Sequence, residues 1–343
     1  MGSSTSASAA SVGAILVTGG AGYIGSHAAK AIAASGRRVV VIDNLSTGHR
    51  DAVRWGELIV ADVRDVARVR ETIRQHEVSA VMHFAASSLV GESVRDPIGY
   101  YANNVGGALA VLEAMVGESV TRLVFSSSAA VFGDPDETPI TEDHPTRPIN
   151  PYGETKLTVE RALGHFERAY GTRSVSLRYF NAAGADPNGD LGEDHQPETH
   201  LIPRAVEAAM GGPALHVFGG DYPTPDGTCL RDYIHVSDLA RAHVLALEHL
   251  ETHGATRVYN LGIGKPFSVQ DVISAVERVS GRRVPAERAP RRSGDPAVLL
   301  ASSERIRTEL GWRPEFVDLD VIVESAWAWR RAHPHGYQEE AVR

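Results

Sequence analysis

Short runs of consecutive apolar residues recur along the chain, separated by longer stretches whose apolar positions have helical spacing. Apolar runs bounded by turn residues predict buried strands, and an apolar stripe repeating every three to four residues predicts a helix. The runs are Ala14–Thr18, Arg38–Ile42, Leu58–Val63, Ala80–Ala86 and Leu123–Ser128. The helical stretches are Ser26–Ser35, Val66–Gln75, Leu109–Met115 and the segment that contains Tyr152. This alternation predicts an α/β fold with a parallel, doubly wound sheet that helices cover on both faces.

Three glycines, Gly19, Gly22 and Gly25, follow the first predicted strand and open the first predicted helix. They let backbone amides approach a pyrophosphate, whose negative charge the helix N-terminus favours. Strand, glycine loop and helix together form the context of a dinucleotide-binding fingerprint. Asp43 ends the second strand, where a carboxylate accepts a hydrogen bond from a ribose 2′-hydroxyl and repels a 2′-phosphate. The first half of the chain is therefore predicted to be a Rossmann-type domain that binds NAD rather than NADP.

Small or polar residues also stand where the other predicted strands end, among them Asp62, Ala85 and Ser128. Ligands of open parallel sheets bind at the carboxyl ends of the strands. We therefore expect these residues at the same edge of the sheet as the glycine loop. Asp62 is expected to contact the adenine, and the small-residue loop at Ala85 to lie along the cofactor.

A phenol and an ammonium lie one helical turn apart, at Tyr152 and Lys156, and so share one helix face. The ammonium is expected to lower the pKa of the phenol from its ordinary value near ~10. Tyr152 would then serve as a base for a substrate hydroxyl. Ser128 is expected to hydrogen-bond the same hydroxyl. This spacing also occurs in helices without chemistry, so it is specific only together with the glycine loop upstream.

Composition narrows the possible partners. The net charge is -9 and no basic run stands out, which argues against nucleic acid or an acidic membrane as a partner. A single cysteine, Cys229, excludes an intrachain disulfide and fits a cytoplasmic protein. No apolar run reaches the roughly 18 residues of a membrane span.

The 15 histidines include no His-Glu-x-x-His motif or comparable cluster, so no metal site is predicted. Residues 1–12, rich in Ser and Ala, are predicted to be a disordered tail rather than a secretory signal.

Several longer motifs occur in an order that resembles the extended short-chain dehydrogenase/reductases, and within them the nucleotide-sugar 4-epimerases, over residues 15–337. They are Thr18–His27, Asp43–Gly48, Val90–Val94, Leu177–Asn181, Asp221–Thr228, Arg231–Val236 and Arg291–Asp295. The resemblance implies an NAD-binding domain over residues 13–182, with a returning segment near 233–262 that adds the strand Val258–Gly262 to the sheet edge. Residues 183–343 are expected to form mainly a smaller α/β substrate-binding lobe, including helices at Val269–Val279 and Ser303–Leu310.

The resemblance also implies a reaction on a UDP-sugar. Tyr152 removes the proton of the C4 hydroxyl while C4 delivers hydride to NAD+. The 4-keto sugar then swings about its anomeric oxygen–phosphorus linkage, and hydride and proton return to the other face. UDP-galactose and UDP-glucose are thereby interconverted. NAD is expected to stay bound, and a homodimer is expected through helices of the first domain.

Site residues follow from the strand-end positions and the resemblance. Ser128, Tyr152 and Lys156 are the expected catalytic residues. The expected cofactor contacts are Gly19, Gly22, Tyr23, Ile24, Asp43, Asn44, Asp62, Val63, Phe84, Ala85, Ala86, Asn103, Ser128, Tyr152, Lys156 and Tyr179. The expected substrate contacts are Ser128, Tyr152, Phe180, Asn181, Thr199, His200, Leu201, Phe218, Arg231, Tyr233, Arg292, Asp295 and Leu299.

The substrate residues divide by chemistry. Arg231 and Arg292 can form paired hydrogen bonds to phosphate oxygens. Phe218 offers an aromatic surface to uracil. By resemblance, Asn181 contacts the diphosphate and Asp295 the uridine ribose.

Other functions compete with this interpretation. A nucleotide-sugar dehydratase or decarboxylase commonly carries an acid after the active-site hydroxyl, whereas Ala129 and Ala130 follow Ser128. A non-catalytic NAD-sensing protein of the same fold has no need of the catalytic trio beside Arg231 and Arg292. An epimerase for N-acetylhexosamines or pentoses remains open, because Leu299 is smaller than the Tyr and larger than the Cys found there in relatives.

The chain also departs from the usual epimerase pattern. Ser88, Ala130, Phe132 and His200 replace residues that are common there, a Lys, a Thr, a Tyr and an Asn respectively. The change at Ser88 removes one positive charge near the cofactor, which bears on NAD affinity and rate rather than on the type of reaction.

Overall fold

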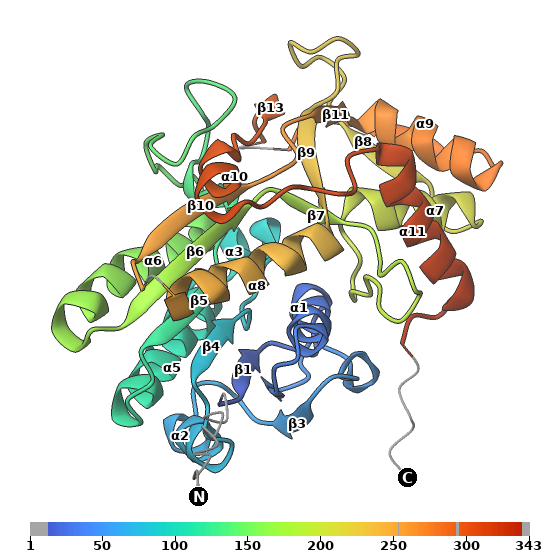
Figure 1. Cartoon of the computed structure of the whole chain (residues 1–343). Coiled ribbons are helices and arrows are strands. Elements are labelled where there is room, and N and C mark those ends of the chain that lie inside the picture. Colours follow the sequence, from blue (N-terminus) through green and yellow to red (C-terminus); the bar gives the residue numbers. More distant parts are fainter. Residues whose placement is uncertain (1–12, 253, 293–294, 338–343) are drawn as a thin grey trace, which may run out of the picture.

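The computed structural model describes residues 13–252, 254–292 and 295–337. The predicted tail, residues 1–12, lies outside the described residues. Two lobes make up the molecule, a larger one around a single sheet and a smaller one at the top right of Figure 1.

A seven-stranded parallel sheet forms the centre of the larger lobe. Its strands, in order across the sheet, are β10 (Arg257–Leu261), β6 (Arg173–Tyr179), β5 (Arg122–Ser126), β4 (Ala80–His83), β1 (Ile15–Thr18), β2 (Val39–Asp43) and β3 (Glu57–Val60). The predicted α/β fold with a doubly wound parallel sheet is confirmed. The strand expected at 258–262 is β10, at the sheet edge beside β6.

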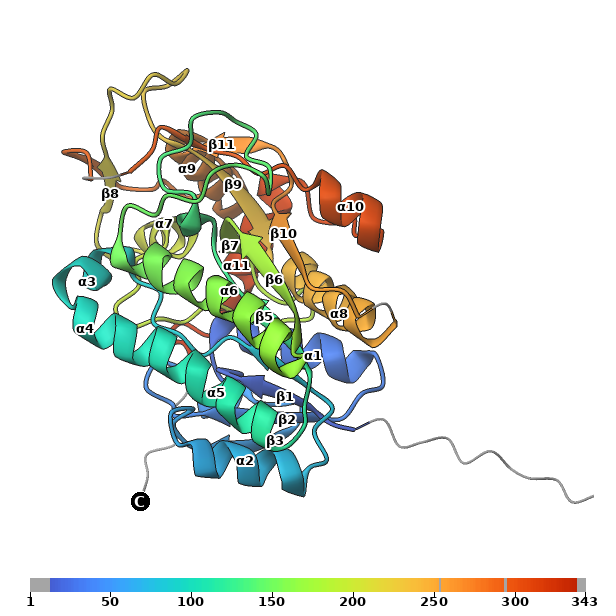
Figure 2. The same ribbon diagram turned by 90° about the vertical axis from the view of Figure 1, so that its left-hand side faces the viewer.

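Helices cover both faces of this sheet (Figure 2). One face carries α1 (Tyr23–Ala34) and α8 (Val236–Thr252), and the other carries α2 (Val66–Gln75), α5 (Gly106–Gly117) and α6 (Pro151–Tyr170). In β1, Val17 packs toward the first helix layer and Leu16 toward the second. Because both faces are buried, the central strands β1, β2 and β4 are almost continuously apolar rather than alternating.

Short helices connect these elements. They are η1 (Arg50–Ala52), α3 (Val90–Arg95), α4 (Pro97–Tyr100), η2 (Tyr101–Val105) and η3 (Ala129–Val131). The turn η2 is a π-helix that leads from α4 directly into α5.

The smaller lobe is built on two small sheets. The strands β7 (Asn181–Ala183), β11 (Pro266–Ser268) and β13 (Val298–Leu299) all pair with β9 (Leu230–His235), and β8 (Leu215–Phe218) pairs with β12 (Ala286–Ala289). The helices α7 (Leu201–Ala209), α9 (Val269–Ser280) and α11 (Leu319–Ala332) share one apolar core with these strands.

One helix lies elsewhere than expected. We expected the helix at Ser303–Leu310 in the smaller lobe, but α10 (Glu304–Leu310) packs on β10 and α8 of the larger lobe. Its Ile306 is fully buried in the same apolar cluster as Tyr259 and Trp312. The expectation was wrong because the chain returns to the larger lobe at this point. There α10 covers β10, an edge strand of the large sheet that lies far from the other strands in the sequence.

Candidate active site

The glycine loop packs tightly against the loop after β4. Gly19 has φ +71°, and a Cβ there would lie 2.5 Å from the backbone nitrogen of Ala85. A Cβ at Gly25 would lie 2.2 Å from the carbonyl oxygen of Gly19. At Gly22, in contrast, a Cβ would meet one neighbour only, at 3.4 Å, so the backbone there has an open side. Two of the glycines therefore close the turn, and the third leaves the start of α1 accessible to a ligand.

The carboxylate of Asp43 is fixed by the backbone beside that turn. Its two oxygens accept hydrogen bonds from the amides of Ala21 (3.0 Å) and Leu45 (2.8 Å). Burial raises the pKa of Asp43, while these two amides act in the opposite direction. The carboxylate is thus held against the glycine loop, as expected for a group that accepts the ribose hydroxyls.

Asn44 and Asp62 come together at the next strand ends. The Arg64 guanidinium, whose Nε lies 2.9 Å from Asp62 Oδ1, holds the pKa of Asp62 below its ordinary value. A hydrogen bond from Asn44 acts in the same direction. Residues near the strand ends thus hold the carboxylate of Asp62 in place without a bound adenine.

The loop after β4 runs along the same edge. Phe84 packs against the ring of His243 at 4.7 Å between centroids. Asn103, from the π-turn η2, donates a hydrogen bond to the hydroxyl of Ser87 at 3.1 Å. Ser88, which replaces the common Lys, is exposed. The remaining expected cofactor residues on this side are Ile24, Val63 and Ala86, each buried or half-buried.

Tyr23, one of the expected cofactor residues, also contacts the smaller lobe. Its hydroxyl donates a hydrogen bond to the carbonyl of Gly184 at 2.6 Å, and its ring contacts His27 and His195 edge-on. Burial, followed by the charges of Glu193 and Glu198, raises its pKa well above the ordinary value. The phenol therefore ties the glycine loop to the smaller lobe, a contact that sequence spacing could not reveal.

Ser128, Tyr152 and Lys156 converge at the carboxyl end of β5. All three are at least nine-tenths buried, with exposures of 9%, 7% and 3%. The hydroxyl of Ser128 accepts a hydrogen bond from Ala130 N at 3.1 Å. Lys156 Nζ lies 5.8 Å from the centre of the Tyr152 ring. The predicted trio is thus assembled at the edge where the glycine loop also lies.

The pKa of Tyr152 differs from the expectation. Burial raises it, and the Ser128 hydroxyl opposes this rise. Burial lowers the pKa of Lys156 to about 7, against the attraction of Glu160. Its ammonium donates to the carbonyl of Ser126 at 2.7 Å rather than to the phenol. The expected lowering of the Tyr152 pKa by Lys156 is therefore not what these groups produce, because desolvation outweighs the charge at this depth.

Tight backbone packing sets the distance between Ser128 and Tyr152. The helix α6 begins under the cap of Asn150, which accepts from Gly153 N at 2.9 Å. A Cβ at Gly153 would lie 2.3 Å from the carbonyl oxygen of Ala130, so only glycine lets α6 approach η3 this closely. Sequence analysis passed over Gly153, although its place beside Tyr152 was a usable signal.

At the other end of the site, Arg231 and Asp295 contact each other directly. The guanidinium on β9 donates to the Asp295 carboxylate, and its Nη1 also donates to the Leu230 carbonyl at 2.7 Å. Burial raises the pKa of Cys229, which also feels the charges of Arg231, Asp295 and Arg292. We had expected Arg231 to bind phosphate and Asp295 to bind ribose; the structure joins them in one ion pair.

Arg292 stacks on Phe218, with 4.0 Å between the guanidinium carbon and the ring centre. One face of the ring expected to hold uracil is thus covered by the arginine. Asn181, on β7, is paired in register with Tyr233 on β9. Phe218, Asn181 and Tyr233 therefore lie on strands of the smaller lobe, and Arg292 follows the strand β12.

Leu299 and Phe180 connect the two ends. Both pack against the apolar cluster that contains Ala129, which directly follows Ser128. Leu299 is also paired in register with Arg231, between β13 and β9. Leu299 thus lies between the segment after Ser128 and Arg231. Tyr179 completes this side, since its hydroxyl lies 2.7 Å from Ser126 Oγ.

The loop before α7 holds a cluster that sequence analysis missed. Glu193, His195, Glu198 and His200 place their oxygens and imidazole nitrogens within 4.8 Å of one another. The spacing Glu-x-His-x-x-Glu-x-His was visible in the sequence and was the signal. Thr199 and Leu201 flank His200, and the amide of Thr199 donates to Glu198 Oε1 at 2.7 Å.

A cavity of about 550 Å³ adjoins this loop rather than the catalytic trio. Its lining includes Glu193, His195, Glu198 and Arg204. None of Ser128, Tyr152 and Lys156 lines it.

The strand ends fit a bound dinucleotide. The open side at Gly22 faces the start of α1, Asp43 stands at the end of β2, and the buried trio closes the far end. A fold of this kind with a Ser, a Tyr and a Lys at the end of β5 defines a dinucleotide-dependent oxidoreductase-type site. Residues 15–262 match the NAD dependent epimerase/dehydratase family, and the chain belongs to that family.

Relatives are similar along almost the whole chain. The UDP-glucose 4-epimerase of Halalkalibacterium halodurans is 53% identical over 328 residues, which cover 95% of this chain and 98% of the relative. The crystal structure of UDP-glucose 4-epimerase from Brucella ovis in complex with NAD is 51% identical, with a TM-score of 0.90 over 92% of this chain and 98% of that one. The structure from Bifidobacterium longum in complex with NAD+ and UDP is 39% identical, with a TM-score of 0.90 over 94% and 100% of the two chains.

Among the described residues, no helix is long and apolar enough to cross a membrane.

Proposed function

We propose that this protein interconverts UDP-glucose and UDP-galactose by oxidation and re-reduction at C4. The observation that carries the proposal is the buried trio of Ser128, Tyr152 and Lys156 at the strand edge that also holds the glycine loop. Sequence identity of 53% over nearly the whole length to a UDP-glucose 4-epimerase supports the substrate class.

Each step assigns a task to a residue of this chain. The glycine loop and Asp43 would hold NAD, which would supply the acceptor for the C4 hydride and the donor that returns it to the opposite face of the sugar. Tyr152 removes the proton of the C4 hydroxyl and restores it after the 4-keto sugar has turned. Ser128 hydrogen-bonds the same hydroxyl and orients it. Lys156 holds its ammonium beside the phenol ring and the Ser126 carbonyl.

The nucleotide end supplies the anchor that this reaction needs, because the sugar has to turn while UDP stays bound. Arg231 and Arg292 bind the diphosphate, Asn181 adds an amide, and Asp295 takes the ribose. Thr199, His200 and Leu201 line the same side. Leu299, packed beside Phe180 and the chain after Ser128, borders the sugar. By this assignment, residues 13–182 with the segment near 233–262 bind NAD, and residues 183–343 mainly bind substrate.

The test is conversion of UDP-galactose to UDP-glucose by purified protein without added NAD. We expect turnover, and we expect nicotinamide in the supernatant after the protein is denatured. Absence of any UDP-glucose would refute the reaction. Turnover that depends strictly on added NAD would retain the reaction but refute the tightly held cofactor.

The second expected partner is another copy of this chain. Apolar side chains are exposed along α3, α4 and α5, with Ile98 82% exposed, Val94 62% and Leu109 40%. Two such helix faces can bury each other about a two-fold axis, which is the commonest symmetry of soluble oligomers. Sedimentation at micromolar concentration should give a dimer, and a monomer would contradict the assignment. A cytoplasmic location agrees with the buried free thiol of Cys229.

A further inference from the structure

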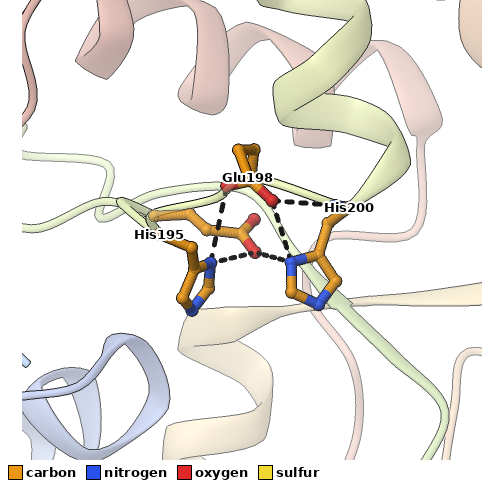
Figure 3. Close-up of side chains that lie close together, drawn as sticks. His195, Glu198 and His200 are labelled. Atoms are coloured by element: carbon orange, nitrogen blue, oxygen red, sulfur yellow. Dashed lines mark hydrogen bonds and ion pairs between the residues drawn. The ribbon is translucent and has the colours of Figure 1, made fainter. Parts of the chain in front are cut away.

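The loop Glu193–His200 folds four potential metal ligands onto one point. The view in Figure 3 shows the rings of His195 and His200 on either side of the carboxylate of Glu198. Both rings direct Nδ1 toward the carboxylates. The four ligand atoms, one from each side chain, lie within 4.8 Å of one another.

The separations between these atoms are those of a small coordination sphere. His195 Nδ1 lies 3.3 Å from Glu193 Oε1 and 3.4 Å from Glu198 Oε2. His200 Nδ1 lies 2.9 Å from Glu193 Oε1 and 3.0 Å from Glu198 Oε1. In a tetrahedral site with ligands at ~2.0–2.2 Å from zinc, neighbouring ligand atoms are about 3.3–3.5 Å apart. Small side-chain rotations therefore bring all four atoms onto one ion.

A second observation concerns His195. Its Nδ1 is buried and makes no hydrogen bond of acceptable geometry, although two carboxylates lie beside it. A nitrogen that is close to two carboxylates but aligned with neither points between them, where a shared ion would sit. Within the described residues, the only ion-pair partners of Glu193 and Glu198 are His195 and His200. In the part of the chain that the structure describes, no arginine or lysine pairs with either carboxylate, so the only positive charge beside them is what the two imidazoles carry when protonated.

Solvent reaches the cluster from one side. Glu193, His195 and Glu198 line the cavity of about 550 Å³, which gives an ion a path inward. The side chain of Glu193 is 6% exposed and that of Glu198 14%, so the carboxylates are enclosed rather than solvated. An enclosed pair of carboxylates needs a compensating positive charge.

We propose that Glu193, His195, Glu198 and His200 bind one divalent transition-metal ion of the zinc class. Two neutral imidazoles and two carboxylates suit zinc or cobalt better than magnesium or calcium, which prefer oxygen ligands throughout. With a dication the site is electrically neutral. This inference does not depend on the proposed epimerase activity.

The position of the site gives the ion a structural task. His195 contacts the ring of Tyr23 at 6.2 Å between centroids, and Tyr23 is the first residue of α1, directly after the glycine loop. At the other end, His200 begins the segment that enters α7. A metal on Nδ1 of His200 fixes the proton on Nε2, so that this nitrogen becomes a hydrogen-bond donor. The ion would thus tie the cofactor loop to the segment expected beside the substrate and set the tautomer of His200.

The direct test is metal binding by the full chain without an affinity tag. The protein is stripped with chelator, dialysed, and titrated with Co²⁺ and then Zn²⁺. We expect one Co²⁺ per chain with the visible absorption of a tetrahedral N/O site, displaced by Zn²⁺. Zn²⁺ should also raise the Tm of the stripped protein, because an ion that binds only the folded state stabilises it.

Matched variants separate this site from adventitious binding. His195→Ala and the nearly isosteric Glu198→Gln should each weaken Zn²⁺ binding at least ~10-fold and abolish the Co²⁺ absorption. His165→Ala removes an exposed histidine on α6 and should change neither. If His195→Ala unfolds the protein, Glu198→Gln carries the comparison. Equal Zn²⁺ affinity and equal Tm shifts in wild type, Glu198→Gln and His165→Ala would overturn the proposal and leave an ion-pair cluster only.

Discussion

The two ends of the proposed active site treat charge in opposite ways. At the carboxyl end of β5, Lys156 is buried and donates to a backbone carbonyl; the described residues give it no ion pair. At the nucleotide end, Arg231 contacts the Asp295 carboxylate directly, and Arg292 lies on the face of Phe218. One end holds an isolated, desolvated charge, and the other holds charges that are already satisfied.

This difference matches the tasks assigned to the two ends. A catalytic group must keep its geometry and its unusual proton affinity through the whole reaction, so burial without a partner is useful there. An anchor for UDP must bind and release, and a phosphate that competes with Asp295 for Arg231 exchanges one ionic partner for another. The buried ammonium of Lys156 thus lowers the stability of the folded protein, whereas the ion pair of Arg231 with Asp295 does not.

The largest effect is expected at the catalytic end, from Tyr152→Phe. Loss of the proton acceptor should lower kcat by ~10²–10⁴-fold. The ring still fills its buried position, so the affinity for UDP, set at the other end, should be unchanged. Epimerisation rates and UDP titration by calorimetry check both statements. Turnover above about a tenth of wild type would remove Tyr152 from the mechanism.

Lys156→Met tests the cost of the isolated charge. In the folded protein the pKa of Lys156 is about 7, below its unfolded value of 10.5. Between these two pH values the unfolded chain therefore binds more protons than the folded protein. The free energy of unfolding of the wild type accordingly rises with pH across that window. Below pH 7 the variant should be more stable than wild type by on the order of a few kcal/mol, less the lost bond to the Ser126 carbonyl. The difference should shrink toward pH 10.5, while activity falls.

Urea denaturation at a pH below 7 and again near 10 measures this. A variant that is less stable than wild type at both pH values would show that the buried charge of Lys156 does not destabilise the folded protein.

Arg231→Ala tests the paired charge at the nucleotide end. It removes hydrogen bonds to the diphosphate and leaves the carboxylate of Asp295 facing it, so the Kd for UDP should rise about 10- to 100-fold. Adding Asp295→Ala to that variant removes this carboxylate but also the proposed ribose contact, so the Kd should not return toward the wild-type value. Arg278→Ala, which breaks the exposed pair with Asp320, is the control and should have no effect. Identical Kd values for all three variants would place the diphosphate elsewhere.

Leu299→Cys is expected to have the smallest effect, because it changes only the space between the two ends. The smaller side chain should raise kcat/KM for N-acetylated UDP-sugars a few-fold relative to UDP-glucose and UDP-galactose, since specificity is a difference in transition-state binding. In the wild type, N-acetylated sugars should react weakly. An unchanged ratio in the variant would show that Leu299 does not border the sugar.

Local sequence signals predicted the larger lobe well. The apolar strands, the glycine loop with Asp43, and the trio of Ser128, Tyr152 and Lys156 all rest on short-range spacing and on the rule that strand ends share an edge. From that rule we expected Ser128 to lie close to Tyr152, although the sequence gives no distance between them.

Long-range contacts account for what the sequence did not predict. The ion pair between Arg231 and Asp295 joins the strand β9 to the segment that precedes β13, both in the smaller lobe. The hydrogen bond from Tyr23 to Gly184 crosses between the lobes. The raised pKa of Tyr152 depends on how deeply it is buried, which spacing alone does not give. Each of these is decided by packing between segments far apart in the chain.

The strand β10 has a consequence for the biosynthesis of the protein. While a ribosome is still adding the smaller lobe, β6 has an unpaired edge, because β10 is synthesised only after α8. The apolar sheet face that α8 later covers, including Val124 of β5 and Val175 of β6, is also bare at that stage. Unpaired edges and exposed apolar faces favour aggregation of partly made chains. A fragment ending at residue 182 should therefore aggregate rather than fold, and chaperone demand should persist until residues near 261 have left the ribosome.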